Sequence, residues 1–128
     1  MNLNRNKLAF LILRLGLAAT LLYAAINILI DPASWFGFVP IWLVNILTSF
    51  NFSIELFLIS HAIIEAGLGL WLLTGWQVRW ASLIIFLDML SILVFHGIDL
   101  VTFRDVGLLG VALFLALYSN NLKIQAPL

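Results

Sequence analysis

The most constraining feature of the sequence is a series of four long apolar segments, at about residues 8–30, 52–74, 78–95 and 105–119. An α-helix rises about 1.5 Å per residue, so roughly 20 apolar residues cross the hydrocarbon core of a bilayer. The connections between the segments are short, except for the first. The sequence therefore predicts an all-α membrane protein, an antiparallel bundle of four transmembrane helices that forms a single domain over residues 1–128.

The composition agrees with a lipid environment. Hydrophobic residues make up 64% of the chain and charged residues 9%, which is too little polar surface for a soluble domain of this size. The net charge is zero, so nothing favours nucleic-acid binding, and the lipid bilayer is the expected partner. The chain has no Cys, which excludes disulfides, thiolate metal sites and CxxC redox chemistry.

The long first connection, residues 31–51, begins with Asp31-Pro32, where the proline ends or starts a helix. Pro40 is followed by an apolar stretch that is too short to cross a membrane. We therefore expect a short interfacial helix within about residues 35–50, in the first extracytoplasmic loop.

The Lys and Arg residues of the loops predict the orientation, because cytoplasmic loops of membrane proteins carry an excess of these residues. With four crossings, four basic residues fall on the same side: Arg5, Lys7, Arg79 and Lys123. The opposite side has Arg104 among acidic residues. Both termini of this multi-pass chain are therefore expected in the cytoplasm.

Three ionisable residues lie inside the apolar segments at similar predicted depths. Arg14 is about 9 Å from the cytoplasmic edge, and Glu65 and Asp88 are about 15 Å from it. A charge in hydrocarbon is costly, so we expect the three side chains to form a buried polar network between neighbouring helices. A second arrangement is open for Arg14, in which its long side chain extends back to the cytoplasmic headgroups.

His61 and Glu65 are four residues apart and therefore share one face of their helix. With Asp88 and Arg14, they are the residues expected to bind a ligand such as the carbonyl group of a quinone, or to carry protons. The alternative is that they only bond neighbouring helices to each other. No metal site is predicted, because no further His lies at a comparable depth, and no nucleophile–base pair identifies catalytic residues.

A second polar group lies toward the extracytoplasmic side and contains Glu55, His96, Asp99, Arg104 and Asp105. Asp105 suits the start of a helix, where a carboxylate faces the positive end of the helix dipole. Arg104 is expected to neutralise Glu55 or Asp99. The alternative is a solvated rim at the interface with no binding role.

Small residues let helices approach closely in membranes. Those expected at contacts between helices are Gly16, Ala19, Ala66, Gly67, Gly69, Gly107 and Gly110. Gly75 follows the second apolar segment and has the position of a helix C-cap, because glycine readily adopts the left-handed conformation.

Several short motifs appear in an order that is typical of a known family. They are Arg14-Leu15-Gly16, then Asp31-Pro32 with Trp35 and Pro40, then Glu65-Ala66-Gly67 with Leu72-Leu73-Thr74-Gly75, and finally Phe103-Arg104-Asp105-Val106-Gly107-Leu108-Leu109-Gly110. With these motifs the chain resembles, over most of its length, the DoxX-like family of small bacterial and archaeal membrane proteins. The resemblance implies four transmembrane helices in a prokaryotic cell (inner) membrane.

Three functions are compatible with the resemblance and the buried polar residues. The first is a redox-associated subunit that binds quinone or another lipid-soluble ligand, since some relatives are associated with quinone-linked oxidation of sulfur compounds. The second is a non-enzymatic accessory or assembly protein that acts through a membrane-protein partner or a homo-oligomer. The third is a proton or small-solute pathway through Arg14, Glu65 and Asp88. Whether the chain is an enzyme stays open.

Overall fold

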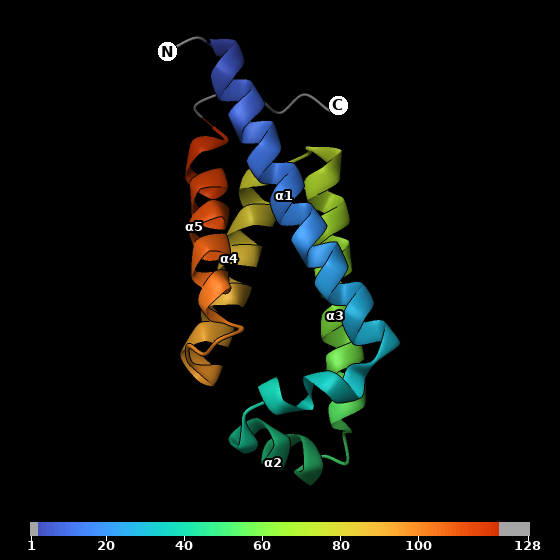
Figure 1. The fold of residues 1–128 in the computed structure, drawn as a ribbon. Helices are drawn as coiled ribbons and strands as arrows, with labels where there is room; N and C mark the ends of the chain where they lie inside the picture. The colour runs from blue at the N-terminus through green and yellow to red at the C-terminus, as the bar shows by residue number, and fades with distance from the viewer. Residues whose placement is uncertain (1–2, 121–128) are drawn as a thin grey trace.

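The computed structural model describes residues 3–120, and in this part of the chain all regular structure is helical, with no strand. Four helices alternate in direction, and two short helices form the connection between the first and second of them (Figure 1). The elements are α1 (Leu3–Ile30), η1 (Pro32–Phe38, a 3-10 helix), α2 (Ile41–Ser49), α3 (Ile54–Thr74), α4 (Val78–His96) and α5 (Phe103–Tyr118).

Within residues 3–120, three helices are long and apolar enough to cross a membrane: Asn4–Ile30 within α1, and the whole of α3 and α4. The predicted all-helical, membrane-type architecture is confirmed to this extent. α5 has 16 residues and is shorter than the roughly 20 that span a bilayer without tilt or thinning. A fourth crossing therefore stays a prediction.

The first helix and the first connection differ in detail from the expectation. α1 already begins at Leu3 rather than near residue 8, because the polar residues before the apolar segment continue the helix. α2 lies inside the segment for which a short helix was expected. η1 precedes it and was not predicted, and Pro40 separates the two because it has an extended conformation (φ −61°, ψ 144°).

The ends of α3 are defined by local chemistry. The Ser53 side chain accepts a hydrogen bond from the Leu56 backbone N–H at 3.1 Å, which satisfies one of the free donors of the first turn. Gly75 ends the helix in the left-handed conformation with φ +73°, so the predicted C-cap is confirmed. The resulting tight turn places α4 antiparallel to α3.

The helices form two pairs, α1 with α3 and α4 with α5, and contacts between the pairs are less extensive. Gly69 lies where α1 and α3 are closest: a Cβ atom there would be 2.9 Å from Leu22 Cγ and 3.3 Å from the Ala18 carbonyl oxygen. Four other glycines were also expected at contacts between helices, and for them the expectation is wrong. They face outward, and a Cβ atom there would have no neighbour within 4 Å: Gly16, Gly67, Gly107 and Gly110.

The space between the two pairs is filled differently at its two ends. At the end near the α3–α4 turn, a core of buried apolar side chains from all four long helices closes the bundle; we call this the packed half, and its members include Leu17, Leu72, Ala81, Ile85, Ala112 and Leu115. At the other end lie η1 and α2 (Figure 1), over a smaller core that includes Ala25, Ile28, Val39, Leu58 and Ala62. We call this end the hollow half, for the reason given next.

Candidate ligand-binding site

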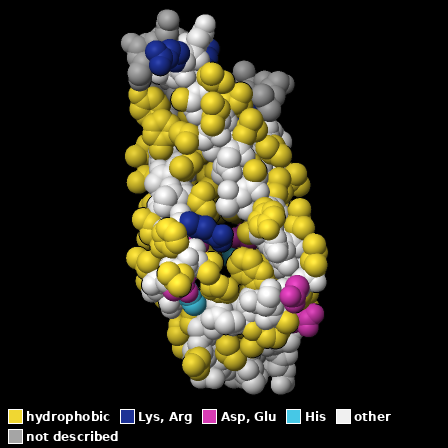
Figure 2. Space-filling model, in the orientation of Figure 1, with side chains coloured by type: hydrophobic (Ala, Val, Ile, Leu, Met, Phe, Trp, Pro, Cys, Tyr) yellow, Lys and Arg dark blue, Asp and Glu magenta, His cyan; other side chains and the backbone are white. Residues whose placement is uncertain are grey.

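A cavity of about 360 Å³ lies in the hollow half, between the α1–α3 pair and the α4–α5 pair. Figure 2 shows this face hollowed near its middle, with basic, acidic and histidine side chains gathered there on an otherwise largely hydrophobic surface. Most of the cavity wall is apolar, and its aromatic members are Trp35, Phe38, Trp42, Phe57 and Phe95. Such size and lining are typical of sites for small apolar molecules.

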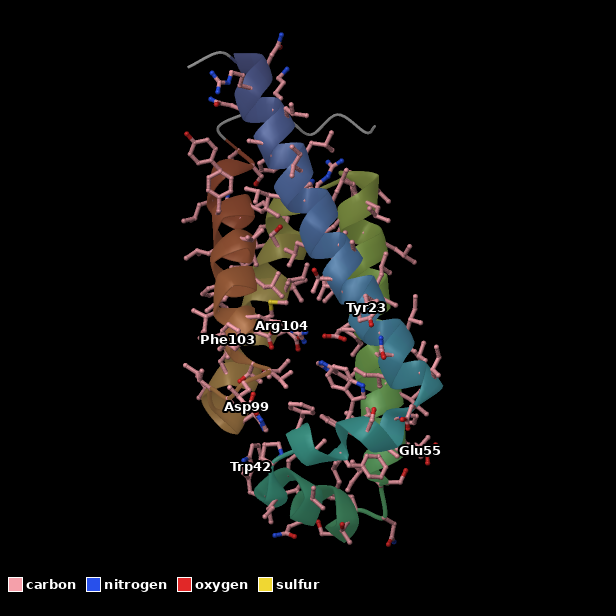
Figure 3. All side chains as sticks on the ribbon, in the orientation of Figure 1. Tyr23, Trp42, Glu55, Asp99, Phe103 and Arg104 are labelled. Carbon is pink, nitrogen blue, oxygen red and sulfur yellow. The ribbon has the colours of Figure 1, made fainter. Side chains whose placement is uncertain are left out.

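η1 and α2 close the outer end of the cavity because their aromatic side chains reach across to α4. Trp42 lies on α2 (Figure 3), and its ring meets that of Phe95 edge-on at 5.2 Å between centroids. The ring of Phe38, in η1, lies 5.2 Å from that of His96. The two short helices thus connect one helix pair to the other, and both rings of each contact line the cavity.

The inner end of the cavity is polar, and three of the predicted site residues meet there. His61 Nε2 lies 3.6 Å from Glu65 Oε1 on the same helix and 3.8 Å from Asp88 Oδ2 on α4. Both His61 and Asp88 keep 24% of their side chains accessible, whereas Glu65 keeps 9%. We call these three residues the inner cluster. Its groups can donate or accept hydrogen bonds and exchange protons with a molecule in the cavity.

Arg14 does not join the inner cluster. The residue is only 2% exposed. Among residues 3–120 it also forms no salt bridge within 4.0 Å, and its buried Nε has no hydrogen-bond partner there. The expected pairing of Arg14 with Glu65 and Asp88 is therefore absent, because a similar depth along the bundle does not make two side chains face each other. The extension of Arg14 toward the headgroups stays a prediction.

Four of the five outer residues line or adjoin the mouth of the cavity at the α4–α5 connection. His96 Nε2 lies 3.0 Å from Asp99 Oδ2, and Arg104 Nε lies 3.3 Å from Asp105 Oδ1. Arg104 points from the start of α5 toward the space between the helix pairs (Figure 3). Glu55 lies apart from them at the start of α3, so the expected neutralisation of Glu55 by Arg104 does not occur.

Asp99 organises the connection at this mouth. Its Oδ1 accepts hydrogen bonds from the backbone N–H groups of Thr102 and Val101, both at 2.8 Å. The backbone donor of Thr102, together with His96 and then Val101, holds the pKa of Asp99 well below its usual range, because each stabilises the ionised carboxylate. Asp99 is therefore a structural anion of the turn, and it does not itself line the cavity, whereas its partners His96, Val101 and Thr102 do.

The sequence did not predict the cavity or its aromatic wall. One signal was present: Phe57 precedes His61 by one helical turn, and their rings stack at 6.4 Å with an interplanar angle of 16°. The other rings come from η1, α2 and α4, and only the folded chain brings them together.

Comparison with known proteins identifies a family. The family model described as DoxX matches residues 9–97, which is more than two thirds of the chain. The matched part includes the inner cluster and ends just before Asp99. No curated protein and no solved structure matches the chain.

Proposed function

The chain belongs to the DoxX family, and we propose that it is a membrane protein that binds quinone, or a similar lipid-soluble molecule with a polar head, in the cavity of its hollow half. The observation that carries the proposal is the cavity itself: an apolar, aromatic wall with the inner cluster at one end. Binding sites for small molecules combine such walls with a few convergent polar groups.

The bound molecule is proposed to lie with its ring among the aromatic side chains and a carbonyl oxygen toward the inner cluster. The His61 ring can donate a hydrogen bond to that carbonyl, and stacking on Phe57 keeps the imidazole in place. Glu65 and Asp88 supply groups through which protons can reach or leave the molecule if its redox state changes. Reduction of a bound quinone would take two electrons from a redox partner protein, and oxidation of a bound quinol would pass two electrons to such a partner.

The proposal includes four crossings, with α5 as the shortest, both ends of the chain in the cytoplasm, and η1 and α2 at the extracytoplasmic interface. The distribution of tryptophans supports this placement, because Trp residues concentrate at membrane interfaces. Trp76 and Trp80 are exposed near the α3–α4 turn, whereas Trp35 and Trp42 lie in η1 and α2. Arg79, which lies over the Trp80 ring, adds positive charge to the proposed cytoplasmic side.

Quinone binding can be tested by tryptophan fluorescence in detergent, since two tryptophans of the cavity wall would be quenched by a bound quinone. Purified protein titrated with a short-chain quinone should show saturable quenching, and this signal should be weaker in Trp42→Phe. The double variant His61→Ala, Glu65→Gln should bind about tenfold more weakly through the loss of buried hydrogen bonds.

The matched control is Glu55→Gln, since Glu55 is an acid of the same helix that does not line the cavity. It should bind as the wild type does. Mass spectrometry of lipid extracts from protein purified out of native membranes should find the natural molecule. Equal quinone affinity in the wild type and the double variant, with no extracted ligand, would contradict the proposal.

A non-enzymatic accessory role is the second candidate. The outward-facing glycines Gly107 and Gly110 on α5 favour it, because small residues on a lipid-exposed helix face permit close contact with another helix. Cysteine crosslinking at Gly110 in native membranes should then capture a specific partner or a second copy of the chain. If crosslinking at Gly110 captures neither a partner nor a second copy of the chain, this face of α5 does not have that role.

A further inference from the structure

The geometry of the inner cluster points to a metal site, and we propose that His61, Glu65 and Asp88 together bind one divalent transition-metal ion. One nitrogen and two carboxylate oxygens, from two different helices, all lie within 4.8 Å of one another. The sequence did not predict this site because it offers no second deep His. The third ligand is instead a carboxylate that the fold brings from α4.

The distances fit a shared ion better than hydrogen bonds between the three side chains. The separations of 3.6 and 3.8 Å from His61 Nε2 to its two neighbours are too long for good hydrogen bonds. Metal bonds to His and carboxylate ligands are about 2.0–2.2 Å long, so two ligands of one tetrahedral ion are about 3.4 Å apart. The three ligand atoms lie within 4.8 Å of one another, so side-chain movements of about an ångström would bring all of them to this separation.

Glu65 provides an independent reason to expect a cation. Its second carboxylate oxygen, Oε2, is buried and has no hydrogen-bond partner within residues 3–120. The residue is only 7% exposed, and it lines the cavity. A buried carboxylate oxygen without a hydrogen-bond partner is destabilising, and a bound cation would remove that cost.

The charge around the inner cluster leads to the same conclusion. In the described part of the chain, no Lys or Arg lies within 4.0 Å of Glu65 or Asp88, and the nearby Arg104 pairs with Asp105. In the metal-bound form, the cluster would supply two ionised carboxylates and a neutral imidazole, and one divalent ion would balance their two negative charges. Nitrogen and oxygen donors without sulfur suit Zn²⁺, Fe²⁺ or Mn²⁺ rather than Cu⁺.

The site has the features of an open metal centre. Three protein ligands leave at least one coordination position, and the cavity is the space available to it. The Phe57 ring stacks on the imidazole and restricts its orientation. Because His61 and Glu65 belong to α3 and Asp88 to α4, the ion would also connect two helices that otherwise share few contacts.

Zinc binding by protein without a polyhistidine tag tests the proposal. Chelator-treated, quinone-free protein in detergent is equilibrated with Zn²⁺ and freed of excess, and bound metal is measured by elemental analysis. We expect one Zn²⁺ per chain and an unfolding temperature that rises with Zn²⁺ concentration. His61→Gln, Glu65→Gln and Asp88→Asn should each weaken binding about a hundredfold or more.

Two matched controls use the chain's own residues. His96→Gln changes the only other His, and Glu55→Gln changes an acid of α3 outside the cluster. Both should bind Zn²⁺ as the wild type does. Asp88→Glu, which keeps the carboxylate, should retain part of the affinity, so loss of binding can be separated from loss of folding.

The proposal is overturned if the wild type binds no Zn²⁺, if Glu65→Gln and Asp88→Asn bind it normally, or if His96→Gln abolishes binding. It goes beyond the proposed quinone function and does not depend on it. Quinone quenching that persists in metal-free protein with no Zn²⁺ affinity would refute the metal site alone. Zn²⁺ binding without any quinone quenching would refute the quinone proposal alone.

Discussion

The packed half and the hollow half are built from the same four helices, yet they differ in what fills the space between the helix pairs. In the packed half, Ala81 and Ala112 let the helices approach while Ile85 and Leu115 fill the remaining volume, and all four side chains are 0% exposed. In the hollow half the corresponding space holds a cavity and the three polar side chains of the inner cluster. The packed half therefore fixes the geometry of the helices, and the hollow half is free to carry a site.

The largest expected effect is the difference in the free energy of unfolding between a large side chain removed from the packed half and one removed from the hollow half. Leu72→Ala in the packed half should lower the free energy of unfolding by about 2–5 kcal/mol, because the fully buried side chain leaves a void. Ile92→Ala should cost clearly less than Leu72→Ala, because this side chain lines the cavity and already lacks neighbours on one side. Equilibrium unfolding in mixed micelles measures both, and equal losses would refute the difference between the halves.

Enlarging a side chain in each half should reveal the same difference, with a smaller change in the free energy of unfolding. Ala81→Leu has no space to enter and should destabilise the bundle by about 1–3 kcal/mol. Ala24→Leu, on α1, would extend into the cavity and should leave stability nearly unchanged. The second variant should also weaken quinone quenching, since it occupies part of the binding space. A strongly destabilised Ala24→Leu would show that the cavity is not available volume.

Residues Ile85 and Ile92 explain why the sequence predicts the helices but not the cavity. They are seven residues apart on α4 and therefore lie on the same helix face. Ile85 is fully buried whereas Ile92 lines the cavity, and this difference depends on how far the other helix pair stands away. Hydropathy reports that a segment is apolar, and it carries no information on the distance between helices.

The candidate site was predictable to the extent that it depends on one helix. His61 and Glu65 share a face because helical geometry fixes the direction of residues four apart. Asp88 was assigned to them by depth alone and does lie beside them, whereas Arg14 was assigned in the same way and does not. Depth is set by position along a helix, but the direction of a side chain depends on the rotation of that helix, which the sequence leaves undefined.

A still smaller change in the free energy of unfolding is expected for substitutions at the contact between α1 and α3. Gly69→Ala would place a methyl group 2.9 Å from Leu22 Cγ, whereas Gly67→Ala would meet no atom within 4 Å. Both changes gain about the same helix propensity, so the difference between them isolates the packing cost. We expect Gly69→Ala to be less stable than Gly67→Ala by about 1–2 kcal/mol. Equal stabilities would show that Leu22 moves aside freely.

The smallest effect is expected at the mouth of the hollow half, where the ionised Asp99 holds the α4–α5 connection. The pKa of Asp99 is lower in the folded protein than the roughly 3.9 of an unfolded chain, so ionisation favours folding. The stabilisation from the ionised Asp99 is fully present above about pH 4, and it is lost as the pH falls toward the lowered pKa of Asp99 in the folded protein. The stability advantage of the wild type over Asp99→Asn should therefore shrink between pH 4 and pH 2.

The control for this titration is Asp31→Asn, because Asp31 is an exposed acid whose side chain makes no capping hydrogen bond to η1. Its stability relative to the wild type should change less over the same interval, measured by unfolding at each pH. An advantage of the wild type over Asp99→Asn that is the same at pH 7 and pH 2 would mean that Asp99 acts through its shape alone. The turn would then be held by hydrogen bonds that an amide can also accept, and the charge at the mouth of the cavity would have no structural role.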